Sequence, residues 1–349
     1  MSAQTGLDRR QLHAGKAIPF VRANVFAPFI GFLDAVGSPV ERWLQHARLP
    51  SSLLEDGEAL VPAMSAYRFL EVAARHEQID DFGAVVGQRS SSFDLGAYGA
   101  ALRGATTVYE YLQLGTRLLG GHSSGTTIWL EAEGAGLRVN QYLAGPPGDG
   151  RCIGDLFTLV LTINTLRRFI GPDWCPTEVR LMAGTQKMLE EPAVFGDARL
   201  LTGQRHTSFT IPREMLQRLA TGPAAVSVSH CEAVSTDHCA MPNDFKGSVE
   251  QVIMSLMDDE CPGMEVAADV AGMSPRTLQR RLAEAGTSYS DLVSASRLRA
   301  AKRWLAESTM PVAEIAARLG YREATNFARA FRRRTGASPA AYRRLCTRR

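Results

Sequence analysis

The C-terminal part of the chain contains an internal repeat, and this repeat constrains the fold more than any other feature. The first copy, VAADVAGMSPRTLQRRLAEAGTS, runs from Val266 to Ser288, and the second, VAEIAARLGYREATNFARAFRRRTGASP, from Val312 to Pro339. In each copy an alanine stands four residues before a glycine, and a pair of apolar residues spaced i,i+4 follows. This pattern is typical of a short helix, a tight turn and a second helix. The repeat predicts two helix-turn-helix units, at about residues 266–287 and 314–336.

The segment between the two copies is predicted to be one long helix. Ser288 and Asp291 form a capping-box pattern at its start, and Pro311 stops it. At 1.5 Å per residue its roughly 20 residues span about 30 Å, which is close to one turn of B-DNA. With a further helix over residues 248–257, the two units would complete an all-helical domain over residues 248–346.

Charge is distributed unevenly along the chain. Residues 264–349 contain 17 Lys and Arg against 7 Asp and Glu, whereas residues 1–263 contain 22 against 29. The net charge of +3 therefore combines a mildly acidic body with a strongly basic end. A basic end favours a polyanion as partner, although charge alone leaves a solvated surface equally open. Together with the repeat, it indicates duplex DNA.

Side chains near the start and middle of each unit's second helix are expected to reach base edges. Arginine pairs with guanine, and asparagine or glutamine pairs with adenine, whereas contacts to phosphates position the protein without reading sequence. The candidate base-reading residues are Arg276, Thr277, Gln279, Arg280, Thr325, Asn326 and Arg329. The candidate backbone-contacting residues are Ser274, Arg332, Arg333, Arg334, Arg343 and Arg344.

Residues 248–346 resemble the DNA-binding domain of AraC/XylS-type regulators. The resemblance is carried by SPRTLQRRLAEAGTSYSDL in the first unit, RLRAAKRWLAES in the connector, and IAARLGY and NFARAFRRRTGASPAAYRR at the end. It implies promoter DNA and RNA polymerase as partners, and leaves activation or repression open. The positions that match the family's recognition helices are Arg276, Gln279, Arg280, Thr325 and Arg329. Ala324 and Thr325 are small residues where many relatives have larger polar ones, which predicts fewer base contacts and more backbone contacts by the second unit.

Residues 1–220 are predicted to form a mixed α+β regulatory domain, followed by a linker over residues 221–247. Strands are expected at 126–131, 137–143, 178–182 and 208–211, with a buried helix over 156–170. DDFGAVVGQ, GAYGAALRGATTVYEYLQL, FIGPDWCPTEVRL and FGDARL resemble the N-terminal domain of the AraC branch that contains ornithine-utilisation-type regulators. This resemblance implies sensing of a small effector or association into a homodimer, but not an arabinose ligand.

Two other patterns keep different functions open. Residues 121–125, GHSSG, match the G-x-S-x-G elbow of hydrolases. That elbow needs a strand before the serine and a helix after it, and the reverse order is expected here. A thiol or metal sensor could use His230, Cys231, His238 and Cys239, although their spacing matches no common zinc finger. The alternatives are therefore such a sensor, or a ligand-binding or hydrolytic protein with an incidental basic tail; we expect no enzyme, no metal and no cofactor.

The sequence also predicts a location in the cytoplasm. Six scattered cysteines do not form the dense framework of a small secreted domain. The longest uncharged apolar run, over residues 156–166, is too short to span a bilayer. We therefore expect no membrane partner.

Overall fold

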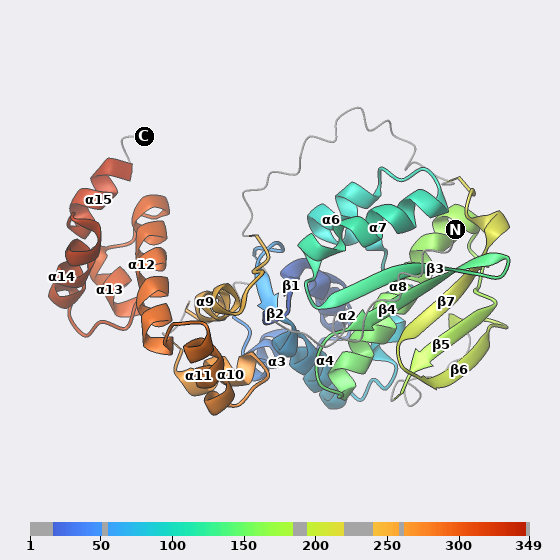
Figure 1. The fold of residues 1–349 in the computed structure, drawn as a ribbon, viewed down its shortest axis with the longest axis horizontal. Coiled ribbons are helices and arrows are strands. Elements are labelled where there is room, and N and C mark those ends of the chain that lie inside the picture. The colour runs from blue at the N-terminus through green and yellow to red at the C-terminus, as the bar shows by residue number, and fades with distance from the viewer. Residues whose placement is uncertain (1–16, 51–54, 184–193, 220–239, 258–261, 347–349) are drawn as a thin grey trace. The chain divides into compact units, whose positions relative to one another are not determined.

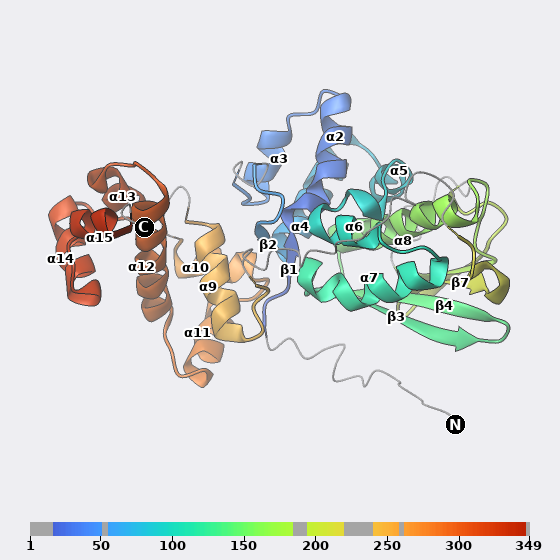
Figure 2. The same ribbon diagram turned by 90° about the horizontal axis from the view of Figure 1, so that it is seen from above.

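The computed structural model describes residues 17–50, 55–183, 194–219, 240–257 and 262–346. They divide into two compact units: the first runs from Pro19 to Met241, and the second comprises residues 17–18 together with those from Pro242 onward. Figure 1 and Figure 2 show a first unit of mixed helices and strands and a second unit made of helices alone. The predicted fold class, an α+β domain followed by an all-α domain with two helix-turn-helix motifs, is confirmed.

The first unit is built around a five-stranded sheet with the strand order β3-β4-β7-β5-β6. Neighbouring strands are antiparallel, except that β5 and β6 run parallel. A separate antiparallel pair joins β1 to β2. The strands are β1 (Phe20–Arg22), β2 (Leu60–Pro62), β3 (Thr126–Glu133), β4 (Gly136–Leu143), β5 (Glu178–Met182), β6 (Arg199–Gln204) and β7 (Thr207–Pro212). The four expected strands are present; β1, β2 and β6 were not expected.

Helix α8 (Asp149–Ile170) is the central helix of the first unit and is buried along most of its length. Phe157 packs in one apolar cluster with α2 to α5, while Leu159 and Phe169 pack in another with α7 and the sheet. In Figure 2, α8 lies between α5 and the sheet. The other helical segments are η1 (Ala23–Phe26), α2 (Ala27–Ala35), α3 (Val40–His46), α4 (Ala63–Glu77), α5 (Phe82–Gln88), η3 (Ser92–Asp94), α6 (Gly96–Leu102), α7 (Val108–His122) and η6 (Arg213–Met215).

A buried carboxylate connects α8 to the sheet. Asp155 is only 1% exposed; Gln141 Nε2 donates to its Oδ1 at 2.8 Å, and the Thr207 hydroxyl donates to its Oδ2. Burial raises the pKa of Asp155 from 3.8 to about 6, although these hydrogen bonds and the charge of Arg151 oppose the shift. The ionised form is therefore less favourable in the folded protein than in the unfolded chain.

Replacing Asp155 by Asn is expected to remove one pH-dependent component of stability. Between pH 4 and pH 6 the folded protein holds this proton and the unfolded chain does not, so wild-type stability falls as pH rises through that window. A shift of about two units corresponds to about 3 kcal/mol. The measurement is the difference in unfolding free energy between wild type and Asp155→Asn at pH 4 and pH 7. A difference that does not change with pH would contradict the burial argument.

The second unit consists of seven helices in its described part. In Figures 1 and 2, α9 to α11 lie on one side of α12 and α13 to α15 on the other. The helices are α9 (Phe245–Ser255), α10 (Met264–Val270), α11 (Pro275–Glu284), α12 (Tyr289–Glu307), α13 (Val312–Arg318), α14 (Ala324–Thr335) and α15 (Pro339–Cys346). Helices α10 and α11 form the first helix-turn-helix unit, and α13 and α14 form the second.

Local hydrogen bonds explain where these helices start and end. The hydroxyl of Ser274 accepts from the backbone N–H of Thr277 at 3.2 Å, and the hydroxyl of Ser288 accepts from that of Asp291 at 3.2 Å. Helix α14 begins after Glu323 without a side-chain cap and ends at Thr335, and the following Gly336 has a φ of +78° that suits glycine. The start of α14 therefore depends more on packing than the starts of α11 and α12 do.

The start of α9 corrects the predicted linker. Residues 245–247, which were placed in the linker, lie in this helix. Asp244 caps it by accepting from the backbone N–H of Gly247, and Phe245 is 8% exposed. The composition of this stretch is typical of a linker, but one cap and one buried aromatic side chain are enough to start the helix. None of the helices within the described residues has both the length and the hydrophobicity that a membrane span requires.

Candidate nucleic-acid interface

Helix α11 has one buried face and one exposed face. Leu278 and Leu282, spaced i,i+4, are at most 1% exposed and hold the helix against the rest of the unit. Arg276, Gln279 and Arg280 are exposed. A helix anchored by one apolar stripe presents its remaining side chains to solvent as a fixed set. The first unit thus presents two guanidinium groups and one amide on one short helix.

Helix α14 is anchored by aromatic side chains. Phe327 and Phe331 are each 2% exposed, and their ring centroids lie 5.7 Å apart. The ring centroids of Tyr321 and Phe327 are 5.5 Å apart. Those of Phe331 and Tyr342, which is in α15, are also 5.5 Å apart, in an edge-to-face arrangement. The side chains of this helix that remain exposed include Thr325, Asn326, Arg329, Arg332, Arg333 and Arg334.

Several of the candidate base-reading residues have intramolecular partners. Arg280 Nη1 lies 3.0 Å from Glu284 Oε1 in an i,i+4 ion pair whose side chains are 66% and 61% exposed. An exposed pair of this kind contributes only about 0.3–0.5 kcal/mol, so DNA can displace it at small cost. Thr325 donates to Glu323 at 3.2 Å, and the hydroxyls of Thr277 and Ser274 are 2.9 Å apart.

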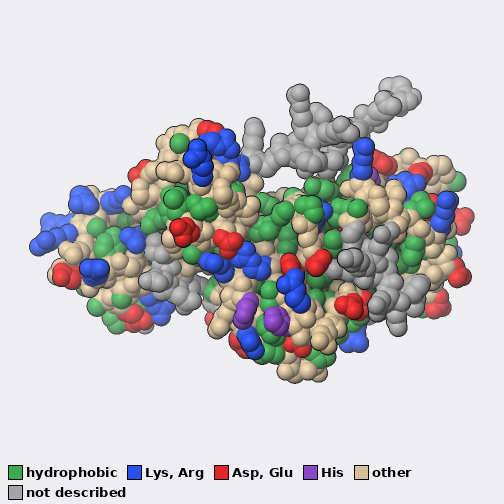
Figure 3. All heavy atoms as spheres, turned by 90° about the horizontal axis from the view of Figure 1, so that it is seen from below, with side chains coloured by type: hydrophobic (Ala, Val, Ile, Leu, Met, Phe, Trp, Pro, Cys, Tyr) green, Lys and Arg blue, Asp and Glu red, His purple; other side chains and the backbone are tan. Residues whose placement is uncertain are grey.

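The candidate backbone-contacting arginines fall into two groups. Arg334 donates to the backbone carbonyl of Ser294 at 3.0 Å, and Arg343 donates to that of Met310, so both also connect parts of the second unit. The others, Arg332, Arg333 and Arg344, are exposed. In Figure 3, Lys and Arg side chains gather on the surface of the C-terminal unit at the left of the view. The unit therefore combines the residue types that phosphates attract with those that read bases.

Two arginines of this region have structural contacts that sequence reasoning missed. The guanidinium of Arg281 lies 3.8 Å from the ring centroid of Phe245, and that of Arg297 lies 5.5 Å from the ring centroid of Tyr321. Partial burial lowers the pKa of Arg281. The first contact joins α11 to α9, and the second joins α12 to the turn before α14. The paired residues are distant in sequence, so no local pattern could have revealed these cation–π contacts. Basic composition alone therefore overstates the number of arginines available to DNA.

The GHSSG segment does not have the geometry of a hydrolase elbow. Helix α7 ends at His122 and β3 begins at Thr126, so a helix precedes the serine and a strand follows it. Ser123 is 5% exposed, and its hydroxyl lies 2.9 Å from that of Thr126. An elbow instead exposes its serine above a sheet. The expected helix-to-strand turn is observed.

The candidate sensor residues His230, Cys231, His238 and Cys239 lie outside the described residues. Among the residues that are described, no group of three or more His, Cys, Asp or Glu side chains is placed to hold a metal ion.

Comparison with known protein families matches both units. Residues 267–345 match a family described as a helix-turn-helix domain, and residues 37–219 match the N-terminal arabinose-binding domain of the AraC transcription regulator. The second match alone covers more than half of the chain. The chain belongs to the AraC family of transcription regulators. This AraC-type regulator has a DNA-binding helix-turn-helix domain and an N-terminal domain of the ligand-binding type, as the sequence resemblance predicted.

Individual relatives agree with this assignment. The AraC-type regulator is 26% identical over 334 residues to the HTH-type transcriptional regulator VirS of Mycobacterium tuberculosis, covering 93% of this chain and 96% of VirS. It is 32% identical over 136 residues to the ornithine utilization regulator of Pseudomonas aeruginosa, covering 38% and 40% of the two chains. The crystal structure of CdpR from Pseudomonas aeruginosa aligns with 88% of this chain and 96% of its own at a TM-score of 0.35 and 22% identity. VirS and the ornithine utilization regulator are both described as regulators.

Proposed function

We propose that the regulator recognises a promoter sequence by inserting α11 and α14 into adjacent major grooves on one face of the duplex. The observation that carries this proposal is the tandem of two helix-turn-helix units on opposite sides of α12. Its 19 residues span about 28 Å at 1.5 Å per residue. Successive major-groove faces on one side of the duplex are about 34–36 Å apart. The length of α12, together with the width of the two units beside it, can span this distance.

Control of transcription is proposed to act through the N-terminal domain. A small effector that binds one state of this domain more tightly than another shifts the population of the DNA-binding form. Association of two copies into a homodimer is the second route by which the domain would act. The bound regulator would then change the rate at which RNA polymerase initiates transcription at the neighbouring promoter. The proposed location of the regulator is the cytoplasm.

Footprinting tests the proposal with the full-length protein. The DNA flanking the regulator's own gene is digested with and without protein, and we expect protection across about two turns of duplex on one face. Transcription by RNA polymerase from the protected promoter should change when the protein is added. The proposal would be overturned if the protein protected no part of this region and also selected no duplex from a random pool.

Arg280→Ala is expected to weaken binding to the cognate site by about 1–3 kcal/mol and to change binding to random DNA little, because a guanine contact is lost. The measurement is the dissociation constant on both duplexes. Arg75→Ala is the matched control, because Arg75 forms a similar i,i+4 ion pair with Glu71 at 2.6 Å in the N-terminal domain. Equal losses by Arg280→Ala on both duplexes would assign Arg280 to the DNA backbone instead.

A further inference from the structure

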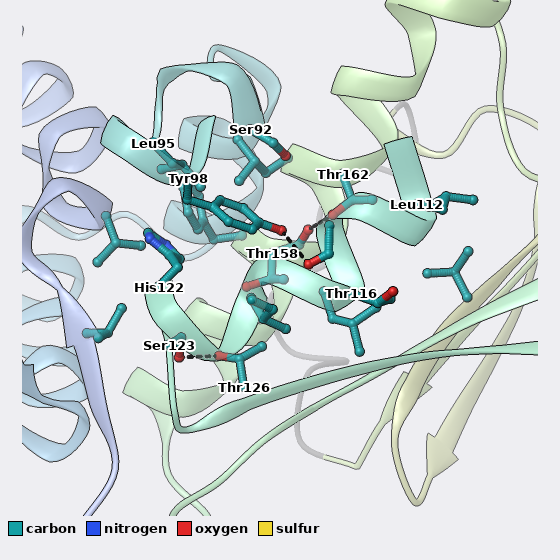
Figure 4. Close-up of a pocket in the computed structure, with 18 of the residues that line it drawn as sticks. Ser92, Leu95, Tyr98, Leu112, Thr116, His122, Ser123, Thr126, Thr158 and Thr162 are labelled. Atoms are coloured by element: carbon teal, nitrogen blue, oxygen red, sulfur yellow. Dashed lines mark hydrogen bonds between the residues drawn. The ribbon is translucent and has the colours of Figure 1, made fainter. Parts of the chain in front are cut away.

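The N-terminal domain contains a partly open cavity bounded by β1, α6, α7, β3, β4 and α8. Its volume is about 80 Å³. An apolar protein cavity of about 150 Å³ holds a benzene molecule, so this smaller cavity takes a ligand of at most about six non-hydrogen atoms. Figure 4 shows Tyr98 and His122 side by side in its wall, together with threonines of α8. The space suits a ligand of about six non-hydrogen atoms.

The wall of the cavity carries no formal charge. None of its lining residues is Asp, Glu, Lys or Arg. Burial raises the pKa of Tyr98 and raises that of Tyr111 to about 12. Burial, together with the charge of Arg22, lowers the pKa of His122 to about 4, so the imidazole is neutral at physiological pH. Arg22 lies outside the lining, and its Nε is 3.8 Å from Glu58 Oε2, so its charge is already paired. A carboxylate or phosphate in this cavity would therefore lose its hydration without gaining an unpaired counter-charge, which disfavours anionic ligands.

Most hydroxyl groups in the wall already donate their proton to the protein. Tyr98 donates to the carbonyl of Gly115 at 3.2 Å, and Tyr111 donates to the hydroxyl of Ser92 at 2.9 Å. Three threonines donate to carbonyls within their own helices at 2.8–2.9 Å; they are Thr116, Thr158 and Thr162. The oxygen atoms of these hydroxyl groups can still accept hydrogen bonds through their lone pairs. The cavity therefore favours a ligand that brings its own hydrogen-bond donor.

His122 contributes to the wall a buried nitrogen atom that lacks a hydrogen-bond partner among the described residues. His122 is 5% exposed and stacks on Tyr98 with ring centroids 4.8 Å apart, but its Nδ1 makes no hydrogen bond to any residue that the structure describes. Buried polar atoms are almost always paired, so an unpaired one beside a cavity marks where a ligand's polar group would sit. A hydroxyl both donates and accepts, and it can satisfy this nitrogen in either neutral tautomer.

We propose that this cavity is the effector site, and that it takes a small neutral alcohol whose hydroxyl pairs with His122 Nδ1 while its hydrocarbon part packs against the apolar wall. The proposal rests on the proposed function, because it places the effector in the N-terminal domain. A free sugar does not fit. A pentose has ten non-hydrogen atoms, more than the cavity admits, and those of its hydroxyls that face apolar residues such as Val139, Phe157 and Leu161 would be left unpaired.

Four probes separate the ligand classes: cyclopentanol, cyclopentane, cyclopentanecarboxylate and L-arabinose. Each is titrated at millimolar concentration into the full-length protein, because so small a ligand binds weakly, and thermal unfolding is recorded. Cyclopentanol is expected to raise the unfolding temperature and to bind about tenfold more tightly than cyclopentane, since one hydrogen bond separates them. The carboxylate and the sugar are expected to have no effect. Stabilisation by either of them, or equal binding of cyclopentanol and cyclopentane, would overturn the proposal.

Two substitutions locate the binding site. His122→Phe keeps an aromatic ring beside Tyr98 but removes Nδ1, and it should abolish the tenfold preference for the alcohol. His76→Phe is the matched control, because His76 stacks on Trp43 at 4.6 Å away from the cavity, and it should retain the preference. If His122→Phe fails to fold, Thr158→Met, which adds bulk to the wall, should weaken both neutral probes. Unchanged preference in His122→Phe, or unchanged binding in Thr158→Met, would contradict the assignment.

Footprinting of the same protein samples distinguishes the two proposals. A footprint without preferential cyclopentanol binding would overturn the cavity assignment alone. Preferential cyclopentanol binding without any footprint would overturn the DNA-binding proposal and leave a small-molecule site in the N-terminal domain. Both results together, with the footprint changed by cyclopentanol in wild type but not in His122→Phe, are what we expect.

Discussion

Raising the salt concentration from 50 to 200 mM is expected to weaken binding of the regulator to its site by about 500-fold. Each neutralised phosphate adds about −0.9 to the slope of log affinity against log salt, so five arginine–phosphate contacts give a slope of about −4.5. The five candidates are Arg332, Arg333, Arg334, Arg343 and Arg344. The measurement is the dissociation constant of the full-length protein on one duplex at four or more salt concentrations.

A double substitution shows whether these arginines cause the slope. Arg332→Gln with Arg333→Gln is expected to reduce the slope by about two, and to weaken binding to cognate and random duplexes equally, because phosphates carry no sequence information. Arg75→Gln removes a similarly exposed helical charge from the N-terminal domain and serves as the control. A slope near zero in wild type would contradict phosphate contact by this unit, and an unchanged slope in the double variant would assign the contacts to other residues.

Phe331→Ala is expected to destabilise the second helix-turn-helix unit by about 3–5 kcal/mol. Phe331 is 2% exposed and joins α14 to α15 through its contacts with Phe327 and Tyr342, so its loss leaves a cavity in the centre of the aromatic cluster. Hydrogen exchange should show faster opening of α14. The footprint should lose the half that α14 protects and keep the half that α11 protects.

Phe331→Leu retains most of the side-chain volume and is the matched control. It is expected to cost about 1.5 kcal/mol or less and to keep both halves of the footprint. If Phe331→Ala weakens both halves equally, or leaves both intact at the wild-type protein concentration, α11 and α14 do not read separate half-sites.

The features that could be predicted from sequence are those with a local physical cause. Ser274 and Ser288 cap the helices that follow them, and the i,i+4 pair Leu278 and Leu282 predicts which face of α11 is buried. The long apolar run of α8 predicts a helix buried on all sides. In each case the residues that determine the structure lie within a few positions of one another, so that a single stretch of sequence contains the whole cause.

The features that could not be predicted depend on segments that are distant in sequence. β6 lies at the edge of the sheet and includes Gly203 and polar residues, so it shows little of the alternation that marks a strand. The cavity needs Tyr98 of α6, His122 of α7 and Thr158 of α8, which only the folded domain brings together. The sequence did single out GHSSG around His122, and its residues prove to form a turn beside the cavity and not a catalytic elbow.

The most direct test of the account is the spacing of the half-sites that the full-length protein selects. Duplexes bound by the protein are recovered from a random pool and sequenced, and we predict two short conserved elements whose centres lie about 10 base pairs apart. Inserting five base pairs between them turns one element to the opposite face of the duplex and should reduce affinity to that of a single element. A single conserved element, or affinity unchanged by the insertion, would contradict a helix that holds two reading helices one duplex turn apart.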